Sequence, residues 1–262
     1  SPSSPASSPW LGRQPGRPWV MAHRGASAAA PANTLAAFRK AVEMGADSIE
    51  LDVHLSADGV PVVIHNFTVD ETTDGKGPVS DLTLAELKRL DAGAKFGPAF
   101  AGERIPTLAE VFAAVGKRLL INIELKTRET RNSGIVPAVL DLIAQAGLTE
   151  RVMLSSFNPL ALRRCSQLAP HMRLGLIYAP NQPLWLRQGW PGILFHHHAR
   201  HMPHSMVDAR TMAWARRRGY EVNAWTVDEL AEMERLIALD VDTITTNTPD
   251  RLLRLLAGGR AG

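Results

Sequence analysis

Short apolar runs alternate with helical patterns along the chain from Trp19 onward. This alternation constrains the fold most, because strands that alternate with helices form parallel sheets. The apolar runs predict strands at Val20–His23, Ser48–Asp52, Val60–His65, Leu119–Leu125, Val152–Phe157, Arg173–Tyr178, Ile193–His196, Glu221–Thr226 and Thr243–Asn247. The helical patterns predict helices at Asn33–Met44, Leu84–Leu90, Leu108–Val115, Ile135–Ala146, Leu160–Leu168, Val207–Arg218, Glu229–Leu239 and Asp250–Leu256.

One predicted strand cannot be parallel to its predecessor. Asp58-Gly59 is a strong signal for a tight hairpin, so Val60–His65 must run antiparallel to Ser48–Asp52. The other eight strands favour an α/β fold, the (β/α)8 TIM barrel, which needs about 250 residues. A doubly wound open sheet is the alternative, but no G-x-G-x-x-G follows the first strand. Residues from about 56 to 106 are too many for one loop and predict a small insertion after the second barrel strand.

The sequence predicts one barrel domain over residues 19–262, preceded by a disordered leader at residues 1–18. The leader is rich in Ser, Pro and Gly and shows almost no apolar periodicity. It lacks the apolar core of a signal peptide, so we expect a cytoplasmic protein; a periplasmic or secreted location stays open, since a signal could have been cleaved.

Composition excludes several classes of partner. No run of about 18 apolar residues occurs, so no stable membrane insertion is expected. The net charge of +3 is too small to indicate a nucleic-acid partner, although the pI of 9.3 is compatible with an anionic substrate. Cys165 is the single cysteine, so no disulfide can form within the chain. The sequence gives no indication of the oligomeric state.

Two carboxylates stand two residues apart in the second predicted strand. Because alternate strand residues face the same side, Glu50 and Asp52 point the same way and repel each other. A divalent cation with hard oxygen ligands, Mg²⁺ or Ca²⁺, would relieve this repulsion. The alternative is an acidic strand end that pairs with Lys or Arg. His65 ends the returning hairpin strand and would fold back towards the acids.

The third barrel strand repeats this pattern. Glu124 and Lys126 share one face of the strand, and Glu124 would complete a third carboxylate around the cation. An ion pair between Glu124 and Lys126 within the strand is the alternative. Three carboxylates, one divalent cation and the side chains of Arg24 and Lys126 would together carry a net charge of about +1. Such a site would accept a ligand with a single negative charge, as a phosphodiester carries.

Histidines from two strands are candidates for proton transfer. His23 and His65 both lie at the predicted mouth of the barrel, and imidazole titrates near neutral pH. One ring could take a proton from an attacking hydroxyl while the other gives one to the leaving alkoxide. The run FHHHARHMPH at 195–204 resembles a metal cluster, but adjacent strand residues face opposite sides. From this run we expect only His196 to line the pocket and the rest to form a loop.

Two aromatic residues at strand ends are predicted to wall the substrate pocket. Trp225 has the parity to face inward and could pack on a glycerol or alcohol moiety, as could Phe157. An ordinary packing role in the core is the alternative for the tryptophan.

These motifs together resemble the glycerophosphodiester phosphodiesterase family. The resemblance runs from Val20 to about Leu253 and rests on an ordered set of motifs: HRG at 23–25, P-x-N-T at 31–34, ELD at 50–52, DG at 58–59, VVIHN at 62–66, IELK at 123–126, AWT at 224–226 and TNTPD at 246–250. It implies a TIM barrel with a small insertion after the second strand, as the strand pattern also predicts.

The resemblance implies hydrolysis of small glycerophosphodiesters to glycerol 3-phosphate and an alcohol, through a cyclic phosphate. It implies that a metal is bound by Glu50, Asp52 and Glu124, and that His23 and His65 form the acid–base pair. Arg24 and Lys126 would hold the phosphate, and Asn33 of the P-x-N-T motif would contact the substrate. The sequence departs from the family pattern at three positions: Ala32 replaces an acid, Asn66 replaces an aspartate, and Glu71 replaces a basic residue.

Two other functions are compatible with the same barrel. A lysophospholipase D-type enzyme would need an apolar surface beside the mouth, which Leu184, Trp185, Leu186 and Trp190 could provide. A barrel that binds phosphodiesters without cleaving them is motivated by the acid lost at Ala32.

Overall fold

A closed barrel of eight parallel strands forms the centre of the protein in the computed structural model, which describes residues 8–127, 134–179 and 195–258. The barrel strands are β1 (Trp19–His23), β2 (Ser48–Leu55), β4 (Leu120–Leu125), β5 (Val152–Ser156), β6 (Arg173–Ile177), β7 (Ala199–Pro203), β8 (Glu221–Trp225) and β9 (Thr243–Thr246). Each strand pairs with the next, and β1 pairs with both β2 and β9, which closes the ring. The predicted TIM barrel is confirmed.

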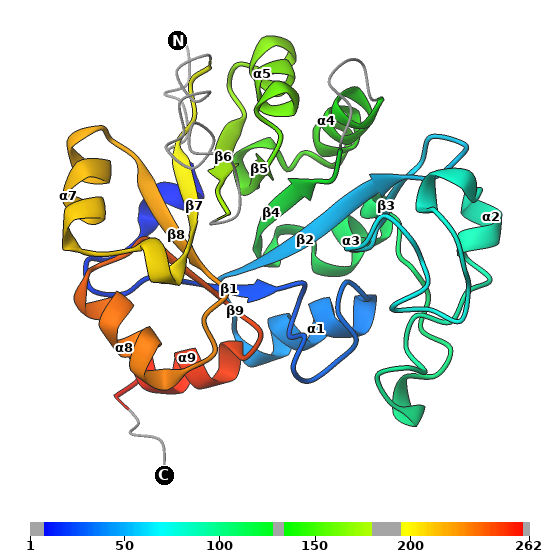
Figure 1. The fold of residues 1–262 in the computed structure, drawn as a ribbon, viewed down its shortest axis with the longest axis horizontal. Helices are drawn as coiled ribbons and strands as arrows, with labels where there is room; N and C mark the ends of the chain where they lie inside the picture. The colour runs from blue at the N-terminus through cyan, green and yellow to red at the C-terminus, as the bar shows by residue number, and fades with distance from the viewer. Residues whose placement is uncertain (1–7, 128–133, 180–194, 259–262) are drawn as a thin grey trace.

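Helices surround this ring on the outside, as Figure 1 shows. They are α1 (Leu35–Met44), α3 (Leu108–Val115), α4 (Ile135–Ala146), α5 (Pro159–Leu168), α7 (Ala209–Arg217), α8 (Leu230–Ala238) and α9 (Pro249–Leu256). The short helix α2 (Leu84–Leu87) belongs to the excursion after β2. Short 3-10 turns occur at Pro9–Gly12, Val79–Asp81, Pro98–Phe100, Gly116–Arg118, Thr149–Arg151 and His204–Met206. Thr107 caps α3 through a capping box with Glu110. Gly45 and Gly147 end α1 and α4 in the left-handed conformation that glycine adopts most readily.

The two faces of each barrel strand have different roles. In β2, Ile49, Leu51 and Val53 are fully buried against the helices, in the largest apolar cluster of the described chain. Glu50 and Asp52 between them face the barrel interior and are also buried. The alternation read from the sequence therefore separates an apolar helix-facing layer from a polar interior.

The excursion after β2 is a small unit with its own core. β3 (Pro61–Val63) pairs antiparallel with β2 across the Asp58-Gly59 turn, as predicted. Seven buried apolar residues form a separate cluster beneath α2: Val62, Ile64, Val69, Val79, Leu87, Ala92 and Ile105. In Figure 1 this excursion extends from the barrel at the right of the view.

The prediction for the sixth barrel strand is wrong. Ile193–His196 was expected, but β7 is Ala199–Pro203; Ile193 lies outside the described residues, and Phe195 and His196 precede the strand. The apolar run that suggested a strand contributes Phe195 to the core from a loop. β7 carries the buried polar residues Arg200 and His201, so its sequence lacks the apolar run by which the other strands were predicted.

Residues 9–18 belong to the barrel and not to a disordered leader. Trp10, which is 2% exposed, packs with Met21, Leu120, Met153 and Ala199 at the amino-terminal end of the strands. Arg13 pairs with Asp240 and Asp242, and Arg17 pairs with Asp47. The segment therefore plugs the end of the barrel opposite the carboxyl ends of the strands. Residues 1–7 lie outside the described part of the chain.

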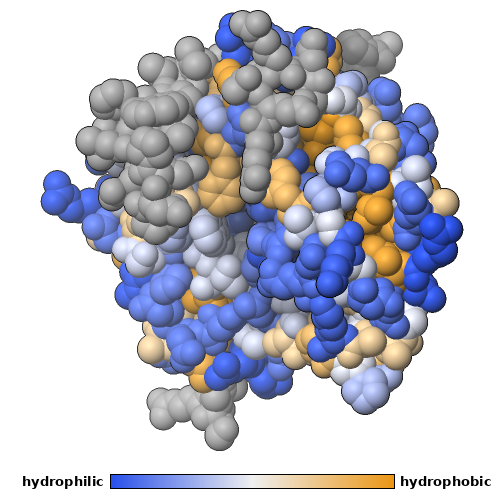
Figure 2. All heavy atoms as spheres, turned by 45° about the vertical axis from the view of Figure 1, so that its right-hand side comes forward, coloured by the Kyte–Doolittle hydropathy of each residue, from blue (hydrophilic) through white to orange (hydrophobic). Residues whose placement is uncertain are grey.

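No helix among the described residues has both the length and the apolar character needed to cross a membrane. The face of the molecule seen in Figure 2 is mostly hydrophilic, with apolar residues gathered in smaller groups between the polar ones.

Candidate active site

Three buried carboxylates meet at the carboxyl ends of two neighbouring strands. Asp52 of β2 is paired in register with Glu124 of β4, and Glu50 lies one inward position below Asp52. One oxygen from each of Glu50, Asp52 and Glu124 lies within 4.8 Å of the others. The three carboxylates therefore face one common point, and the arrangement could hold one metal ion.

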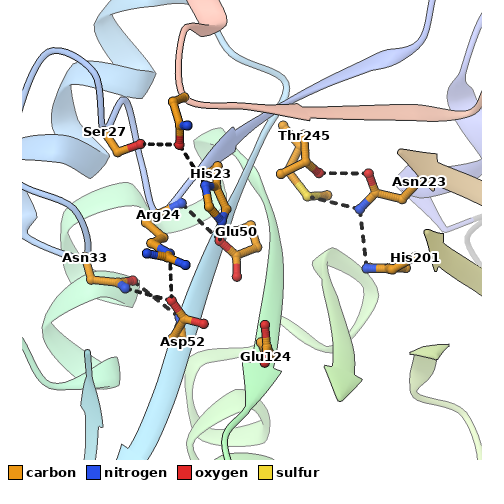
Figure 3. Close-up of polar contacts among 12 residues, drawn as sticks. His23, Arg24, Ser27, Asn33, Glu50, Asp52, Glu124, His201, Asn223 and Thr245 are labelled. Carbon is orange, nitrogen blue, oxygen red and sulfur yellow. Dashed lines mark hydrogen bonds and ion pairs between the residues drawn. The ribbon is translucent and has the colours of Figure 1, made fainter. Parts of the chain in front are cut away.

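Two basic side chains contact this triad, and Figure 3 shows one of them, Arg24, beside Asp52. Lys126 Nζ lies 3.0 Å from Asp52 Oδ1 and 2.5 Å from Glu124 Oε1. Arg24 Nε lies 3.4 Å from Asp52 Oδ2, and the Arg24 backbone N–H donates to Glu50 Oε2 at 3.0 Å. Arg24 adopts a left-handed backbone with φ of 56°, which turns this N–H towards the acid. The alternative of acid–base pairing, left open by the sequence, is thus present alongside the possible metal site.

The carboxylates differ in their affinity for protons. Burial and the neighbouring carboxylates raise the pKa of Glu50, and burial followed by Asp52 raises the pKa of Glu124 to about 7. Burial opposes ionisation of Asp52 as well, but Lys126 and Arg24 lower its pKa to about 2. The side chains of Lys126 and Arg24 therefore stabilise mainly the ionised form of Asp52. The negative charges that Glu50 and Glu124 would carry are not fully compensated.

His23 stands beside the triad at the end of β1. Its Nε2 lies 3.9 Å from Glu50 Oε2, and its Nδ1 lies 2.7 Å from Asn247 Oδ1. Burial, followed by the charge of Arg24, lowers the pKa of His23 to about 4. The ring is therefore neutral at neutral pH and able to accept a proton at Nε2.

His65 reaches the same pocket from the loop after β3. Its Nδ1 lies 2.6 Å from Asn66 Oδ1, and burial lowers its pKa. His54 Nε2 lies 3.1 Å from the backbone carbonyl oxygen of His65. Burial lowers the pKa of His54 to about 4, so this ring is neutral and donates that bond. His54 thereby anchors the loop, although sequence reasoning did not single it out.

One pocket joins these groups. It is lined by His23, Arg24, Glu50, His65, Asn122, Glu124, Lys126, Phe157, Ile177, His201, Asn223, Trp225, Thr226 and Thr245. Phe157 and Trp225 meet edge to face with ring centroids 6.1 Å apart, and form an aromatic wall above the polar floor. The structure thus brings both predicted aromatic residues to the pocket.

Asn33 and His196 lie elsewhere. Asn33 is buried and holds Asp52: its Nδ2 donates to Asp52 Oδ2 at 2.8 Å, and its Oδ1 accepts from the Asp52 backbone N–H. His196 is exposed, stacks edge to face on His198, and does not line the pocket. It was placed in the pocket because the strand was expected too early in the chain.

His201 occupies the inward position of β7 that was expected for His196. It is fully enclosed, and burial lowers its pKa to about 3. Asn223 Nδ2 lies 3.3 Å from His201 Nδ1, and Asn223 Oδ1 accepts from Thr245. The period-2 alternation of HARHMP could have revealed this residue, had the strand been placed correctly.

Comparison with known proteins identifies the family. The sequence profile of the glycerophosphoryl diester phosphodiesterase family matches residues 23–251. The chain belongs to this family. A glycerophosphodiester phosphodiesterase of Caldanaerobacter subterraneus subsp. tengcongensis is 44% identical over 242 residues, which cover 92% of this chain and 98% of the relative. The family predicted from the motifs is confirmed, and with it an enzyme of the phosphodiesterase class.

Solved structures of family members share the fold. A phosphodiesterase of Oleispira antarctica, in complex with the product sn-glycerol-3-phosphate, is similar with a TM-score of 0.85 and 31% identity, covering 92% of this chain and 97% of that one. A glycerophosphodiester phosphodiesterase of Agrobacterium tumefaciens str. C58 is similar with a TM-score of 0.76 and 31% identity, covering 88% and 97%.

The three departures from the family pattern lie together. Ala32, Asn66 and Glu71 line a second, smaller cavity that shares Arg24 and His65 with the main pocket. Asn66 Nδ2 donates to the Glu71 carboxylate, so two of the departures contact each other.

Proposed function

We propose that the protein hydrolyses glycerophosphodiesters to glycerol 3-phosphate and an alcohol, with a divalent cation, Mg²⁺ or Ca²⁺, held by Glu50, Asp52 and Glu124. The observation that carries this proposal is the buried triad itself, which lies beside two imidazoles and two basic side chains in one pocket. Membership of the family, and the product bound by the Oleispira relative, support the same class of substrate.

The triad fits a hard divalent cation. It offers only oxygen donors, as Mg²⁺ and Ca²⁺ prefer. The raised pKa values of Glu50 and Glu124 indicate that Arg24 and Lys126 do not balance all three carboxylates. When bound, the cation would supply positive charge to the phosphoryl oxygens. Together with the two basic residues it would leave a net charge of about +1, which suits a phosphodiester monoanion.

His23 and His65 would move the protons. One imidazole takes the proton of the glycerol 2-hydroxyl while its oxygen attacks phosphorus, and the other protonates the alkoxide whose P–O bond breaks. The product of this step is a five-membered cyclic phosphate and the free alcohol. Water then attacks phosphorus, the bond to the 2-oxygen breaks, and the rings exchange roles to give glycerol 3-phosphate.

The remaining site residues would orient the substrate. Arg24 and Lys126 hold the phosphate oxygens and Asn33 keeps Asp52 in place. Phe157 and Trp225 pack on the glycerol or alcohol moiety. Lys126 lies 6.0 Å from the centre of the Phe157 ring, which fixes the ammonium group at the base of this wall.

Release of glycerol 3-phosphate from glycerophosphocholine, measured with and without EDTA, tests the proposal. Turnover should require a divalent metal, and Glu50→Gln and Glu124→Gln should each lose at least about 100-fold in kcat. Glu43→Gln is the matched control, because Glu43 is an exposed acid on α1 that pairs with Lys40. Full activity of either site variant would remove the metal site, and no turnover of any glycerophosphodiester with any divalent metal would remove the activity.

The two alternative functions are distinguished by the same assay. A lysophospholipase D would hydrolyse lysophosphatidylcholine at least as fast as glycerophosphocholine; the residues that could form its apolar surface, Leu184, Trp185, Leu186 and Trp190, lie outside the described part of the chain. A non-catalytic barrel would bind phosphodiesters in calorimetry and release no product.

A further inference from the structure

Each of the two imidazoles in the pocket has an asparagine behind its Nδ1 atom. Asn247 Oδ1 lies 2.7 Å from Nδ1 of His23, and Asn66 Oδ1 lies 2.6 Å from Nδ1 of His65. A neutral ring nitrogen can donate or accept, and an amide can present either its oxygen or its NH2 group. The tautomer of each histidine therefore depends on what holds the amide in its orientation.

A carboxylate fixes the amide of Asn247. Its Nδ2 donates to Asp228 Oδ2 at 2.7 Å, and its Oδ1 accepts from Ser27 Oγ at 2.8 Å. Asp228 is itself held by the backbone N–H of Asn247 and by Thr246 Oγ1. A carboxylate can only accept, so the NH2 group must face Asp228 and the oxygen must face the ring. His23 therefore carries its proton on Nδ1, and Nε2 faces Glu50.

Asn66 is arranged in the same way. Its Nδ2 donates to the Glu71 carboxylate, which leaves the oxygen towards His65 Nδ1. Two chain segments far apart in the sequence thus present the same order of groups: a carboxylate, an asparagine amide and then an imidazole.

We propose that the pairs Asn247–Asp228 and Asn66–Glu71 are positioning residues that hold both catalytic histidines in the Nδ1–H tautomer. This inference rests on the proposed function, which gives His23 and His65 the proton transfers. With both Nδ1 atoms occupied, Nε2 is the only atom of each ring that exchanges a proton with the substrate. Each ring can then act as base in one step and as acid in the other without flipping its orientation.

The neutral amide between ring and carboxylate matters for this exchange. A carboxylate directly on Nδ1 would stabilise the imidazolium form and make its proton harder to give up. An amide orients the ring but carries no net charge, while the carboxylate one bond further away orients the amide.

Glu71→Lys tests the inference, because a lysine can only donate. The Asn66 amide should turn its oxygen towards the introduced ammonium group and its NH2 group towards His65, which then must accept at Nδ1. The His65 ring should shift to the Nε2–H tautomer, which ¹⁵N NMR of the imidazole nitrogens reads directly in protein without substrate. We expect kcat to fall by about 10- to 100-fold with little change in KM.

A second substitution should reverse this effect. In Asn66→Asp combined with Glu71→Lys, the aspartate accepts from both the lysine and His65 Nδ1, so the Nδ1–H signal should return. The activity should recover only in part, because a carboxylate now lies directly on Nδ1. Glu71→Gln removes the acceptor-only group without adding a donor-only one, so the His65 signals should report a mixture of the two tautomers. Glu43→Lys, which makes the same change at an exposed acid of α1, is the matched control and should alter neither signal.

Asp228→Asn provides an independent test at His23. It removes the acceptor-only group behind Asn247, so the His23 signals should report a mixture of tautomers while His65 is unchanged. Wild-type tautomer signals and wild-type kcat in both Glu71→Lys and Asp228→Asn would overturn the inference. If the wild-type enzyme cleaves no glycerophosphodiester, the proposed function fails, and the NMR spectra still decide whether the asparagines set the tautomers.

Discussion

At the scale of single residues, a buried histidine and a glycine on the next strand depend on each other. A Cβ atom at Gly175 would lie 2.4 Å from Nε2 of His201, so the ring fits inside the barrel only because β6 has no side chain at this point. The ring forms part of the pocket floor. This pair links the packing of the barrel interior to the shape of the site.

We expect Gly175→Ala to lower the free energy of unfolding by about 1–3 kcal/mol, as overpacking of a filled core does. Urea denaturation measures the change. The double variant Gly175→Ala with His201→Ala should recover part of the loss, because the clash is gone. Strictly additive effects of the two substitutions would show that the residues do not constrain each other.

The raised pKa of Glu124 makes stabilisation by metal dependent on pH. Burial and Asp52 raise this pKa from 4.5 to about 7, so the folded protein holds an extra proton between these values. The stability associated with that proton is complete below pH 4.5 and is lost as the pH rises through about 7. A cation that binds the ionised triad should therefore raise Tm more at about pH 8 than at about pH 5.5.

Thermal unfolding with and without Mg²⁺ or Ca²⁺ at both pH values checks this prediction. The buried histidines with lowered pKa values affect both samples alike, so the difference between them isolates the triad. Glu124→Gln should remove most of the pH dependence of the metal effect. An equal rise in Tm at both pH values would contradict the assignment of Glu124.

At the scale of elements, the cap of α3 ties the excursion to the barrel. The Thr107 hydroxyl accepts from the Glu110 backbone N–H at 3.1 Å, and the Glu110 carboxylate accepts from the Thr107 backbone N–H at 2.7 Å. Thr107 also forms a bridge with Val62 of β3, the hairpin strand that leads to His65. The start of α3 thus supports the loop that carries His65.

Thr107→Ala should lower the free energy of unfolding by about 1 kcal/mol, the usual contribution of an N-cap. Thr107→Ser retains the hydroxyl and should change stability by only a few tenths of a kcal/mol. Guanidinium denaturation curves of the two variants measure both effects. A serine variant as unstable as the alanine variant would assign the loss to the methyl group and not to the cap.

At the scale of the whole molecule, the candidate site and a stabilising plug lie at opposite ends of the barrel. The carboxyl ends of the strands carry the triad, and the amino ends are closed by Trp10 against Met21, Leu120, Met153 and Ala199. TIM barrels separate catalysis and stability in this way. Substitutions at the closed end should therefore change unfolding and leave the kinetic constants of the folded enzyme alone.

Trp10→Ala should lower the free energy of unfolding by about 3–5 kcal/mol, because it empties a filled site. Leu11→Ala is the matched control, since Leu11 is 62% exposed and should change stability by less than about 0.5 kcal/mol. Chemical denaturation measures stability, and the glycerol 3-phosphate assay on folded protein should give an unchanged kcat for both. A fall in kcat for the tryptophan variant would show that the two ends are coupled.

Sequence reasoning succeeded where the signal is local. Period-2 alternation placed Glu50, Asp52 and Glu124 on one face of their strands, and the Asp58-Gly59 turn reversed the chain into an antiparallel strand. It failed where a contact overrides the local pattern. β7 was misplaced because burying His201 requires a gap on a neighbouring strand, and Trp10 was read as part of a leader because its partners come from four different strands.

The order of the motifs along the chain was enough to determine the fold, the family and the acids and histidines of the candidate site, because strand periodicity and turn chemistry are properties of neighbouring residues. Only the tertiary structure decides which polar groups form hydrogen bonds with those acids and histidines. Asp228, Asn247 and Ser27 come from separate segments and meet at His23 because the barrel closes β9 onto β1. These contacts join side chains from segments far apart in the sequence, so no local pattern reveals them.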